Sequence, residues 1–278
     1  MFDGLLFELI LSVVAAHLVM VPLGIKWQFR PLQIVARALF MSMICLVALM
    51  LLPDEWGLWI RFAAGVCLAI LQIPLVILPF LYADPERAVK IAEDIVLSPA
   101  DGRIIYVKKS TKGVLPLGEK RGETFELREL LGISGFDDDC ILVGITMNFL
   151  DVHVNRAPVT GVLTRITDAG DSYLSLRKPL AVIRNSRRTS IFESGNCSVA
   201  VVQIASRMVR RIVGFHKEGT RIGQGDRFGM IRLGSQVDVA VPGSQVEDVL
   251  VSKGDLVVAG VTPLMRLAGI HRNDRGTE

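Results

Sequence analysis

Three polar residues are candidates for chemistry because of their types and their neighbours. Asp101 precedes Gly102, His153 lies in a β-branched, apolar stretch, and Ser235 follows Gly234. A serine hydroxyl becomes a nucleophile when a histidine removes its proton and a carboxylate orients that histidine. The chain order Asp, His, Ser is compatible with such a triad, whether the serine attacks a substrate or the chain itself.

Each residue also has a common structural explanation. Asp-Gly is a frequent turn pair, a single histidine among β-branched residues is more often structural than catalytic, and Gly-Ser is a frequent dipeptide. No G-x-S-x-G nucleophile elbow surrounds Ser235. The interpretation therefore depends on the longer stretches that contain the three residues.

Taken together, these stretches resemble the signature sequences of the phosphatidylserine decarboxylase family. The resemblance lies in Leu97–Gly102, Asn148–Pro158 and Phe228–Val239, in the order of the family. Asp84–Arg87 resembles the family's junction between membrane anchor and enzyme domain. The resemblance runs from about residue 84 to about residue 242 and looks closest to the shorter branch of the family.

The resemblance implies that the chain cuts itself between Gly234 and Ser235. Ser235 Oγ would attack the carbonyl of Gly234, with His153 as the base and Asp101 as the partner that orients it. Ser235 would then become a pyruvoyl group, the covalent cofactor, and no metal is expected. The C-terminal fragment would hold 278 − 234 = 44 residues.

The resemblance also implies the reaction. The pyruvoyl ketone would condense with the serine amine of phosphatidylserine and draw electrons as carbon dioxide leaves, so that phosphatidylethanolamine is released. His153 would return a proton to the lipid. Arg156 stands where one branch of the family has a second histidine, so either His153 serves both steps or another residue helps. Arg156, Arg187 and Arg188 are candidates for binding the lipid phosphate, without an assignment.

From about residue 94 onward, the sequence indicates a mainly β (α+β) domain. Short β-branched runs alternate with turn residues, and one helix is expected over Glu126–Leu131. Two pairs of segments repeat, and they resemble barrel-sandwich β-hairpins: Glu218–Gly225 with Lys253–Gly260, and Pro99–Ile104 with Pro158–Leu163. The clearest strand candidates are Arg103–Val107, Ile141–Ile145, Ser198–Val202 and Val237–Val241.

Three long apolar runs, Leu5–Ile25, Gln33–Leu52 and Trp56–Tyr82, precede this domain. Each is long enough to cross a hydrocarbon layer of roughly 30 Å as a helix. The first run contains the polar residues Glu8 and His17, so an interfacial helix is an alternative there. The predicted organisation is a membrane anchor of two to three transmembrane helices (1–83) and a self-cleaving decarboxylase domain (84–278), processed into 1–234 and 235–278.

Charged residues between the runs predict the orientation in the membrane. Lys26 and Arg30 follow the first run, whereas Asp54 and Glu55 follow the second. The positive-inside rule then places the enzyme domain on the cytoplasmic side of the cell (inner) membrane. Arg61, near the start of the third run, is expected to extend to the interface.

Composition limits the partners. The net charge is +3 and aromatic residues make up 6% of the chain, so no nucleic-acid partner is expected. The expected partners are the phosphatidylserine substrate and the bilayer, and a homo-oligomer is compatible with the sequence. Two other functions remain open from the residues alone: a membrane adaptor or carrier with a lipoyl-like β domain, and a membrane serine hydrolase. A carrier needs a lysine between apolar residues at a hairpin tip, and an adaptor needs a coiled coil; the sequence has neither feature.

Overall fold

The chain forms two units. The computed structural model describes residues 2–26, 29, 31–53, 55–81, 83–116, 124–132, 136, 139–148, 150–176, 178, 180–195, 197–207, 211–231 and 235–269. Contacts between residues divide the chain into Met1–Phe80 and Leu81–Glu278.

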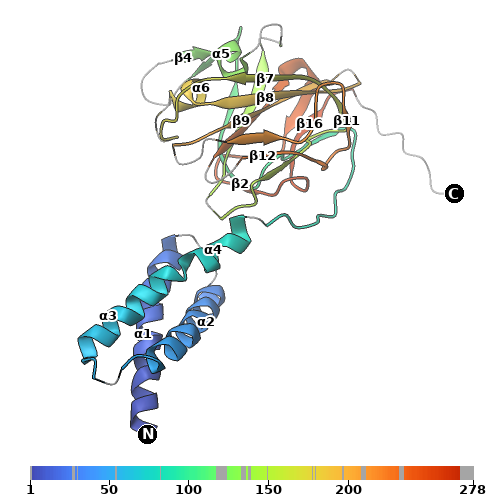
Figure 1. Cartoon of the computed structure of the whole chain (residues 1–278). Helices are drawn as coiled ribbons and strands as arrows, with labels where there is room; N and C mark the ends of the chain where they lie inside the picture. The colour runs from blue at the N-terminus through green and yellow to red at the C-terminus, as the bar shows by residue number, and fades with distance from the viewer. Residues whose placement is uncertain are drawn as a thin grey trace, which may run out of the picture. The chain divides into compact units, whose positions relative to one another are not determined.

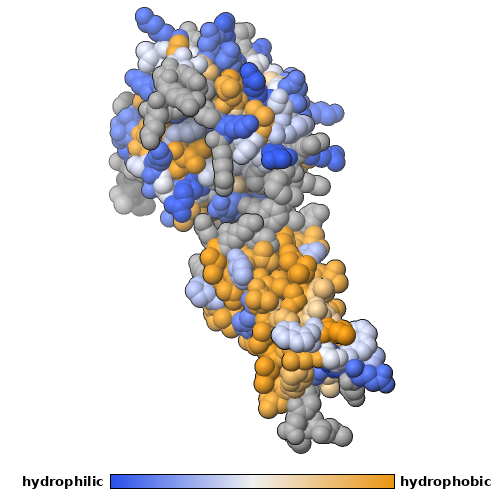
Figure 2. Space-filling view, turned by 90° about the vertical axis from the view of Figure 1, so that its left-hand side faces the viewer, coloured by the Kyte–Doolittle hydropathy of each residue, from blue (hydrophilic) through white to orange (hydrophobic). Residues whose placement is uncertain are grey.

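The first unit consists of apolar helices. These are α1 (Phe2–Lys26), α2 (Pro31–Met50), α3 (Leu58–Leu71) and α4 (Ile73–Leu81). Three stretches are long and apolar enough to cross a membrane: Leu6–Ile25, Pro31–Met50 and Leu58–Pro79. Apolar residues gather over the surface of this unit in Figure 2, as expected for helices that contact lipid. The three apolar segments expected from the sequence are therefore confirmed as helices that fit a membrane.

The third apolar run forms two helices instead of one. The backbone N–H of Gln72 bonds to the carbonyls of Leu68 and Ala69, both at 3.2 Å, and ends α3. Pro74 is the second residue of α4. Because proline has no N–H to donate, α3 cannot continue through it with regular bonding, and the break falls just before it.

A buried ion pair joins α1 to α3. Arg61 lies 2.6 Å from Glu8 and donates hydrogen bonds to the carbonyls of Leu49 (3.0 Å) and Pro53 (2.9 Å). Both charged side chains are buried. The Arg61 guanidinium therefore has its partners within the helical unit, and the two carbonyls lie at the C-terminal end of α2. The pairing also explains an acidic residue in an apolar helix.

The second unit is built on an eight-stranded antiparallel sheet. Its strand order is β11-β7-β8-β9-β13-β5-β2-β15, and Figure 1 shows β7, β8 and β9 side by side. The strands are β2 (Gly102–Lys109), β5 (Cys140–Thr146), β7 (Gly161–Ala169), β8 (Arg187–Ser194), β9 (Cys197–Ile204), β11 (Arg221–Ile222), β13 (Gln236–Pro242) and β15 (Leu256–Val257).

Three smaller sheets and short helices complete this unit. One sheet joins β1 (Ile95–Leu97), β16 (Pro263–Leu267) and β14 (Val246–Val249), and another joins β10 (Ile212–Gly214), β12 (Arg227–Ile231) and β6 (Val154–Arg156). The third is β3 (Val114–Pro116) with β4 (Thr124–Glu126), and the helices are α5 (Leu127–Leu131), α6 (Ala181–Arg184) and the 3-10 turn Gly243–Gln245. The mainly β (α+β) architecture, all four predicted strands and the predicted helix are confirmed.

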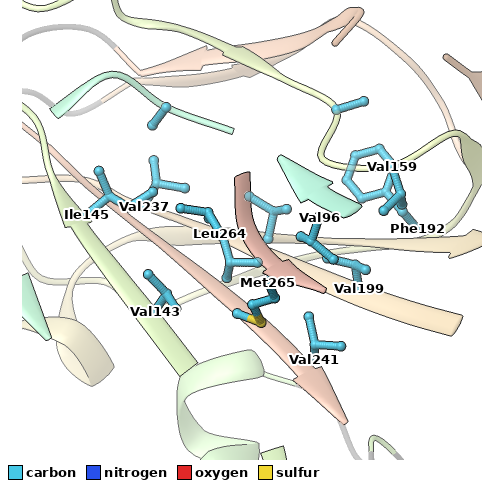
Figure 3. Close-up of a cluster of buried hydrophobic side chains, with 14 of the residues drawn as sticks. Val96, Val143, Ile145, Val159, Phe192, Val199, Val237, Val241, Leu264 and Met265 are labelled. Carbon is cyan, nitrogen blue, oxygen red and sulfur yellow. The ribbon is translucent and has the colours of Figure 1, made fainter. Parts of the chain in front are cut away.

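Each face of the large sheet covers its own hydrophobic core. On one face, Val237 and Val241 of β13 pack with Leu264 and Met265 of β16 (Figure 3). On the other face, Ala240 of β13 belongs to a core that α5 covers. Because side chains alternate along a strand, the central strand β13 is buried over its whole length.

The repeats seen in the sequence adopt the same structure. β15 pairs with β2, and β11 pairs with β7, at the two ends of the large sheet. In the first copy Gly254 N–H donates to the Ile104 carbonyl, and in the second Gly219 N–H donates to the Leu163 carbonyl, both at 2.8 Å. In each copy, the turn before the short strand therefore bonds to the equivalent residue of the longer strand.

The two copies also exchange hydrogen bonds with each other. Leu97 N–H donates to the Pro158 carbonyl, and Arg156 N–H donates to the Pro99 carbonyl, both at 2.9 Å. The two segments before the paired strands therefore lie against each other reciprocally.

Candidate active site

Asp101 lies in the turn before β2 and is held by two other segments. Arg87 donates to both carboxylate oxygens, at 2.5 and 2.8 Å, and the backbone N–H of Ala259 donates to Oδ1 at 2.8 Å. Arg87 also donates to the Ala259 carbonyl at 2.7 Å. The bidentate arginine contact fixes the orientation of the carboxylate.

The other copy of the repeat has a hydroxyl at the equivalent position. Thr160 Oγ1 accepts a hydrogen bond from the Gln224 N–H at 3.0 Å, as Asp101 accepts one from Ala259. The backbone scheme is the same, so the carboxylate at 101 is not required by the fold. Asp101 is therefore a candidate for a role in function rather than in the fold alone.

His153 lies just before β6 and is 3% exposed. Burial lowers its pKa from the ordinary 6.5, while a hydrogen bond to the Asp151 backbone and the charge of Asp101 raise it and partly offset this effect. Near neutral pH the imidazole is therefore uncharged and can accept a proton. The charge of Asp101 therefore acts on the His153 imidazole.

Ser235 is fully buried and immediately precedes β13. Its carbonyl accepts the N–H of Met147 at 2.9 Å, and its hydroxyl donates to Met147 Sδ at 3.2 Å. Because a thioether is a weak acceptor, the hydroxyl is not committed to a strong partner. The geometry of the Gly234–Ser235 bond lies outside the described residues, since Gly234 is not among them.

The loop from Met147 to His153 connects the surroundings of the three residues. Met147 contacts Ser235, and His153 ends the loop. In between, Asp151 accepts the Asn148 N–H at 2.6 Å. Burial raises the pKa of Asp151, the Asn148 hydrogen bond partly offsets this, and the charge of Asp101 adds to the increase. The described part of this loop thus contacts Ser235 at one end and carries His153, near Asp101, at the other.

Sequence reasoning missed a buried amide pair beside this loop. Asn155 donates to the Pro99 carbonyl at 3.2 Å, and Gln203 Nε2 donates to Asn155 Oδ1 at 2.7 Å. Gln203 lies opposite Val237 in the large sheet, two residues from Ser235. Both amides are fully buried. A polar side chain in the apolar run of β9 was the available signal, because buried polar groups need partners.

The direction of these hydrogen bonds is fixed by their partners. Asn155 Nδ2 must donate to the Pro99 carbonyl, so Asn155 Oδ1 faces Gln203. Gln203 must therefore donate its Nε2 to this oxygen. Gln203 Oε1 is left without a hydrogen bond in the part of the chain that the structure describes. It therefore offers a buried acceptor close to the strand that begins after Ser235.

Arg156 has a structural role at the junction segment. It donates to the carbonyls of Gly225 and Pro85, both at 3.0 Å, and pairs with Asp84 at 3.3 Å. These bonds hold the segment that carries Arg87, so Arg156 does not replace a second histidine as a base.

The other two arginines considered for phosphate binding also have internal partners. Arg187 donates to the Leu130 carbonyl at 2.8 Å, and Arg188 forms a bidentate pair with Asp168 at 2.7 Å. None of the three arginines is assigned to the phosphate.

A buried histidine, a carboxylate held by Arg87 and a buried serine are the candidate residues for acid–base chemistry. Comparison with protein families gives the particular class. The model of the phosphatidylserine decarboxylase family matches residues 80–264, a span that includes all three residues. The chain therefore belongs to the phosphatidylserine decarboxylase family, and it is an enzyme of that decarboxylase class.

Individual relatives agree with this assignment. The phosphatidylserine decarboxylase proenzyme of Xanthobacter autotrophicus is 41% identical over 188 residues, which cover 67% of this chain and 72% of the relative. That of Azorhizobium caulinodans is 41% identical over 184 residues, covering 66% and 70%. A putative archaetidylserine decarboxylase proenzyme of Methanopyrus kandleri is 35% identical over 213 residues, covering 75% and 89%. The family resemblance expected from the sequence is confirmed, and the adaptor and hydrolase alternatives lose their support.

Proposed function

We propose that the chain converts phosphatidylserine to phosphatidylethanolamine with a pyruvoyl group that it makes from its own Ser235. The observation that carries the proposal is the single family match over residues 80–264, which contains Asp101, His153 and Ser235. The relatives are named proenzymes, a term for precursors that are processed. Residues 1–83 are the membrane anchor, and residues 84–278 are the self-cleaving domain.

The processing reaction uses residues of the chain alone. Ser235 Oγ attacks the carbonyl carbon of Gly234 while His153 accepts the hydroxyl proton. The peptide C–N bond breaks, the nitrogen takes a proton, and an ester joins Gly234 to Ser235. Loss of the Cα proton and of the Gly234 carboxylate leaves a double bond at position 235. Water then replaces the nitrogen, which leaves as ammonia, and residue 235 retains a ketone.

The titration of His153 supports its role as the base. Burial lowers its pKa, so the uncharged form predominates near neutral pH. Once it takes the proton, the nearby charge of Asp101 stabilises the imidazolium. Arg87 and Ala259 keep the Asp101 carboxylate in one orientation, so the charge does not need to reorganise during the reaction.

The surroundings of Ser235 fit a covalent keto group. Ser235 is fully buried, which protects a reactive carbonyl at this position from side reactions. The pyruvoyl group supplies a carbonyl that condenses with the substrate amine and takes up the electrons released with carbon dioxide. His153 is the candidate to return a proton to the substrate carbon, because it is the buried titratable base of the Met147–His153 loop.

The position of β13 explains how the processed enzyme stays whole. Cleavage before Ser235 leaves β13 at the start of the new fragment, and β13 pairs with β5 on one side and β9 on the other. These backbone hydrogen bonds and the two cores remain after the peptide bond is cut. The 44-residue fragment is thus held without a covalent link.

The membrane supplies the substrate. Three helices fit a membrane, and a two-chain lipid does not leave the bilayer readily, so an anchored enzyme meets it at high effective concentration. The basic residues that follow the first helix support a cytoplasmic position of the domain at the inner membrane, by the positive-inside rule. A homo-oligomer remains compatible with this arrangement.

Intact mass of the purified full-length protein tests the proposal. We expect two fragments, one of 44 residues (278 − 234) whose N-terminus is blocked. Ser235→Ala should abolish both cleavage and carbon dioxide release, while Ser244→Ala, a change at an exposed serine, should affect neither. Active protein with an uncut chain and an unmodified Ser235 would refute the proposal.

The relatives also suggest which lipids to compare. The relative from Methanopyrus kandleri carries an archaetidylserine name, and that lipid and phosphatidylserine share the serine headgroup. Assaying both lipids at equal headgroup density would define tail preference, because the acid–base site acts on the headgroup alone.

A further inference from the structure

The turn over residues 253–261 carries three exposed apolar side chains. Leu256 is 69% exposed, Val258 is 41% exposed and Val261 is 45% exposed. Large apolar groups in water are unfavourable. Isolated examples are common on protein surfaces, so their grouping in one turn requires a separate argument.

The turn is held rigidly beside Asp101. Val261 N–H donates to the Val258 carbonyl at 3.1 Å, and Val258 N–H donates to Thr262 Oγ1 at 2.9 Å. Between the two valines, Ala259 bonds to Asp101 through its N–H and to Arg87 through its carbonyl. The apolar side chains are therefore fixed next to a residue of the candidate active site.

The second copy of the repeat shows that the fold does not require apolar residues here. With the glycines at 254 and 219 aligned, Leu256 corresponds to Arg221 and Val258 corresponds to Gly223. Arg221 is exposed and Gly223 is partly exposed, as at the matching positions of the first copy. The same backbone thus accommodates a charged residue and a glycine at these positions. The fold therefore does not account for the exposed apolar residues of the first copy, and a partner outside the chain would.

Charge and connectivity indicate what that partner is. Exposed Arg103 donates to the Gly254 carbonyl at 2.5 Å, and Lys253 is also exposed, so cationic groups flank the apolar ones. Apolar side chains beside basic ones favour the interface of a bilayer that contains anionic lipid. Arg87, which bonds to Ala259, follows the end of α4 at Leu81 by six residues (87 − 81).

We propose that the 253–261 turn is a lipid-contacting surface that places Leu256, Val258 and Val261 in the interfacial layer of an anionic bilayer. There it admits the lipid headgroup to the site next to Asp101. The entry of substrate rests on the function proposed above, whereas the membrane contact does not depend on it.

Fluorescence quenching tests the contact without any assay of activity. The full chain, with Cys67 (the exposed cysteine) replaced by alanine, receives the label NBD at Leu256→Cys or, as the matched control, at Arg221→Cys. The protein is reconstituted in phosphatidylcholine–phosphatidylglycerol vesicles that contain nitroxide lipids. We expect about threefold stronger quenching at position 256 than at position 221 if the first turn lies in the interface. Equal quenching at the two positions would overturn the proposal.

Kinetics test the entry of substrate. The variant Leu256→Gln/Val258→Thr/Val261→Thr should raise KM for phosphatidylserine in vesicles about tenfold, because partitioning of the turn into lipid weakens. Its kcat, its self-cleavage and its turnover of a water-soluble short-chain phosphatidylserine should not change. An unchanged KM in vesicles, or an equal loss on both substrates, would overturn the entry route. Quenching at position 256 in a protein that never releases carbon dioxide would refute the proposed function and leave the membrane contact standing.

Discussion

Asp101 acts on His153 through its charge, and the sign of that effect can be tested. Asp101 raises the pKa of His153 against the larger, opposing effect of burial. Asp101→Asn keeps an acceptor for Ala259 but removes the negative charge and leaves the Arg87 cation without its counter-charge. Both changes disfavour the imidazolium.

We therefore expect Asp101→Asn to lower the pKa of His153 further. The measurement is an NMR titration of the histidine ring signals in a Ser235→Ala background, which keeps the chain uncut. Glu218→Gln, a change at an exposed carboxyl, serves as the control and should leave this pKa as it was. An unchanged or increased pKa of His153 in the Asp101→Asn variant would remove Asp101 from its assigned role.

Arg87 is a positioning residue rather than one that touches the reacting atoms. Its guanidinium fits both oxygens of Asp101, and lysine cannot reproduce this two-point contact. We expect Arg87→Lys to slow self-cleavage about tenfold, as for the loss of one bidentate, charge-assisted contact. The half-time of fragment appearance during cell-free synthesis is the readout. Arg188→Lys breaks a similar pair with Asp168 and should leave the half-time unchanged; equal slowing in both variants would contradict this role.

The amide pair of Asn155 and Gln203 makes a stability prediction. Asn155→Leu leaves the buried Gln203 amide without its partner, which costs about 1–3 kcal/mol, while the Pro99 carbonyl keeps its bond from the Arg156 N–H. Thermal unfolding in detergent should show a lower Tm. Adding Gln203→Leu should recover part of the loss, because replacing both polar partners is less costly than orphaning one. If the double variant lost more stability than the sum of the losses in the two single variants, the amides would not act as a pair.

Strand β13 carries a different polar network on the face opposite to Ser235. Tyr106 donates to Asp238 at 2.6 Å, and Gln236 donates to the other oxygen of Asp238 at 2.8 Å. Burial raises the pKa of Asp238 to about 6 from the ordinary 3.8. A carboxyl with a higher pKa in the folded state holds its proton more tightly there, so it stabilises the fold at low pH.

That stabilisation is lost as pH rises from 3.8 through about 6, because the unfolded state ionises first. The change is on the order of 3 kcal/mol for a shift of this size. Asp238→Asn does not titrate, so its Tm relative to the unchanged protein should rise over this pH interval. Asp248→Asn, at an exposed carboxyl, should show little pH dependence. A Tm difference for Asp238→Asn that stays constant across the interval would contradict the buried titration.

Local elements of this fold could be predicted from the sequence, but their arrangement could not. The β-branched runs such as Val237–Val241 became strands because side-chain branching and alternation act locally. The third apolar run divides at Gln72 because Pro74 removes a donor, which the sequence also contained. Strand order in the large sheet depends on contacts between segments far apart in the chain, and no local pattern specifies them.

The residues of the candidate site also divide into those that the sequence predicts and those whose role depends on the folded arrangement. Asp101, His153 and Ser235 were found because each lies in a recognisable stretch. Arg87 lay within the junction segment, yet its bond to Asp101 depends on how that segment docks. Gln203 was missed because its only signal is one polar residue in an apolar strand, and the meaning of that residue depends on Asn155 in a different sheet.

The processed enzyme should behave as one particle. Its shorter fragment begins with β13, the strand between β5 and β9. The same fragment carries β16, whose Leu264 and Met265 pack with Val237 and Val241 of β13 in one hydrophobic core. We expect the two fragments to co-elute in detergent and to separate only in denaturant, at the midpoint at which sheet structure is lost. Fragments that separate in native buffer would show that the sheet does not retain β13.

The reciprocal hydrogen bonds between Leu97–Pro99 and Arg156–Pro158 show how the two copies of the repeat are arranged in the enzyme domain. They relate the two copies of the repeat by an approximate internal twofold axis, as in an isologous interface within one polypeptide. The acid of the pair, Asp101, comes from one half, and the imidazole of His153 precedes the other. With the roles proposed for Asp101 and His153, neither half alone would supply both groups, so a working centre requires both halves.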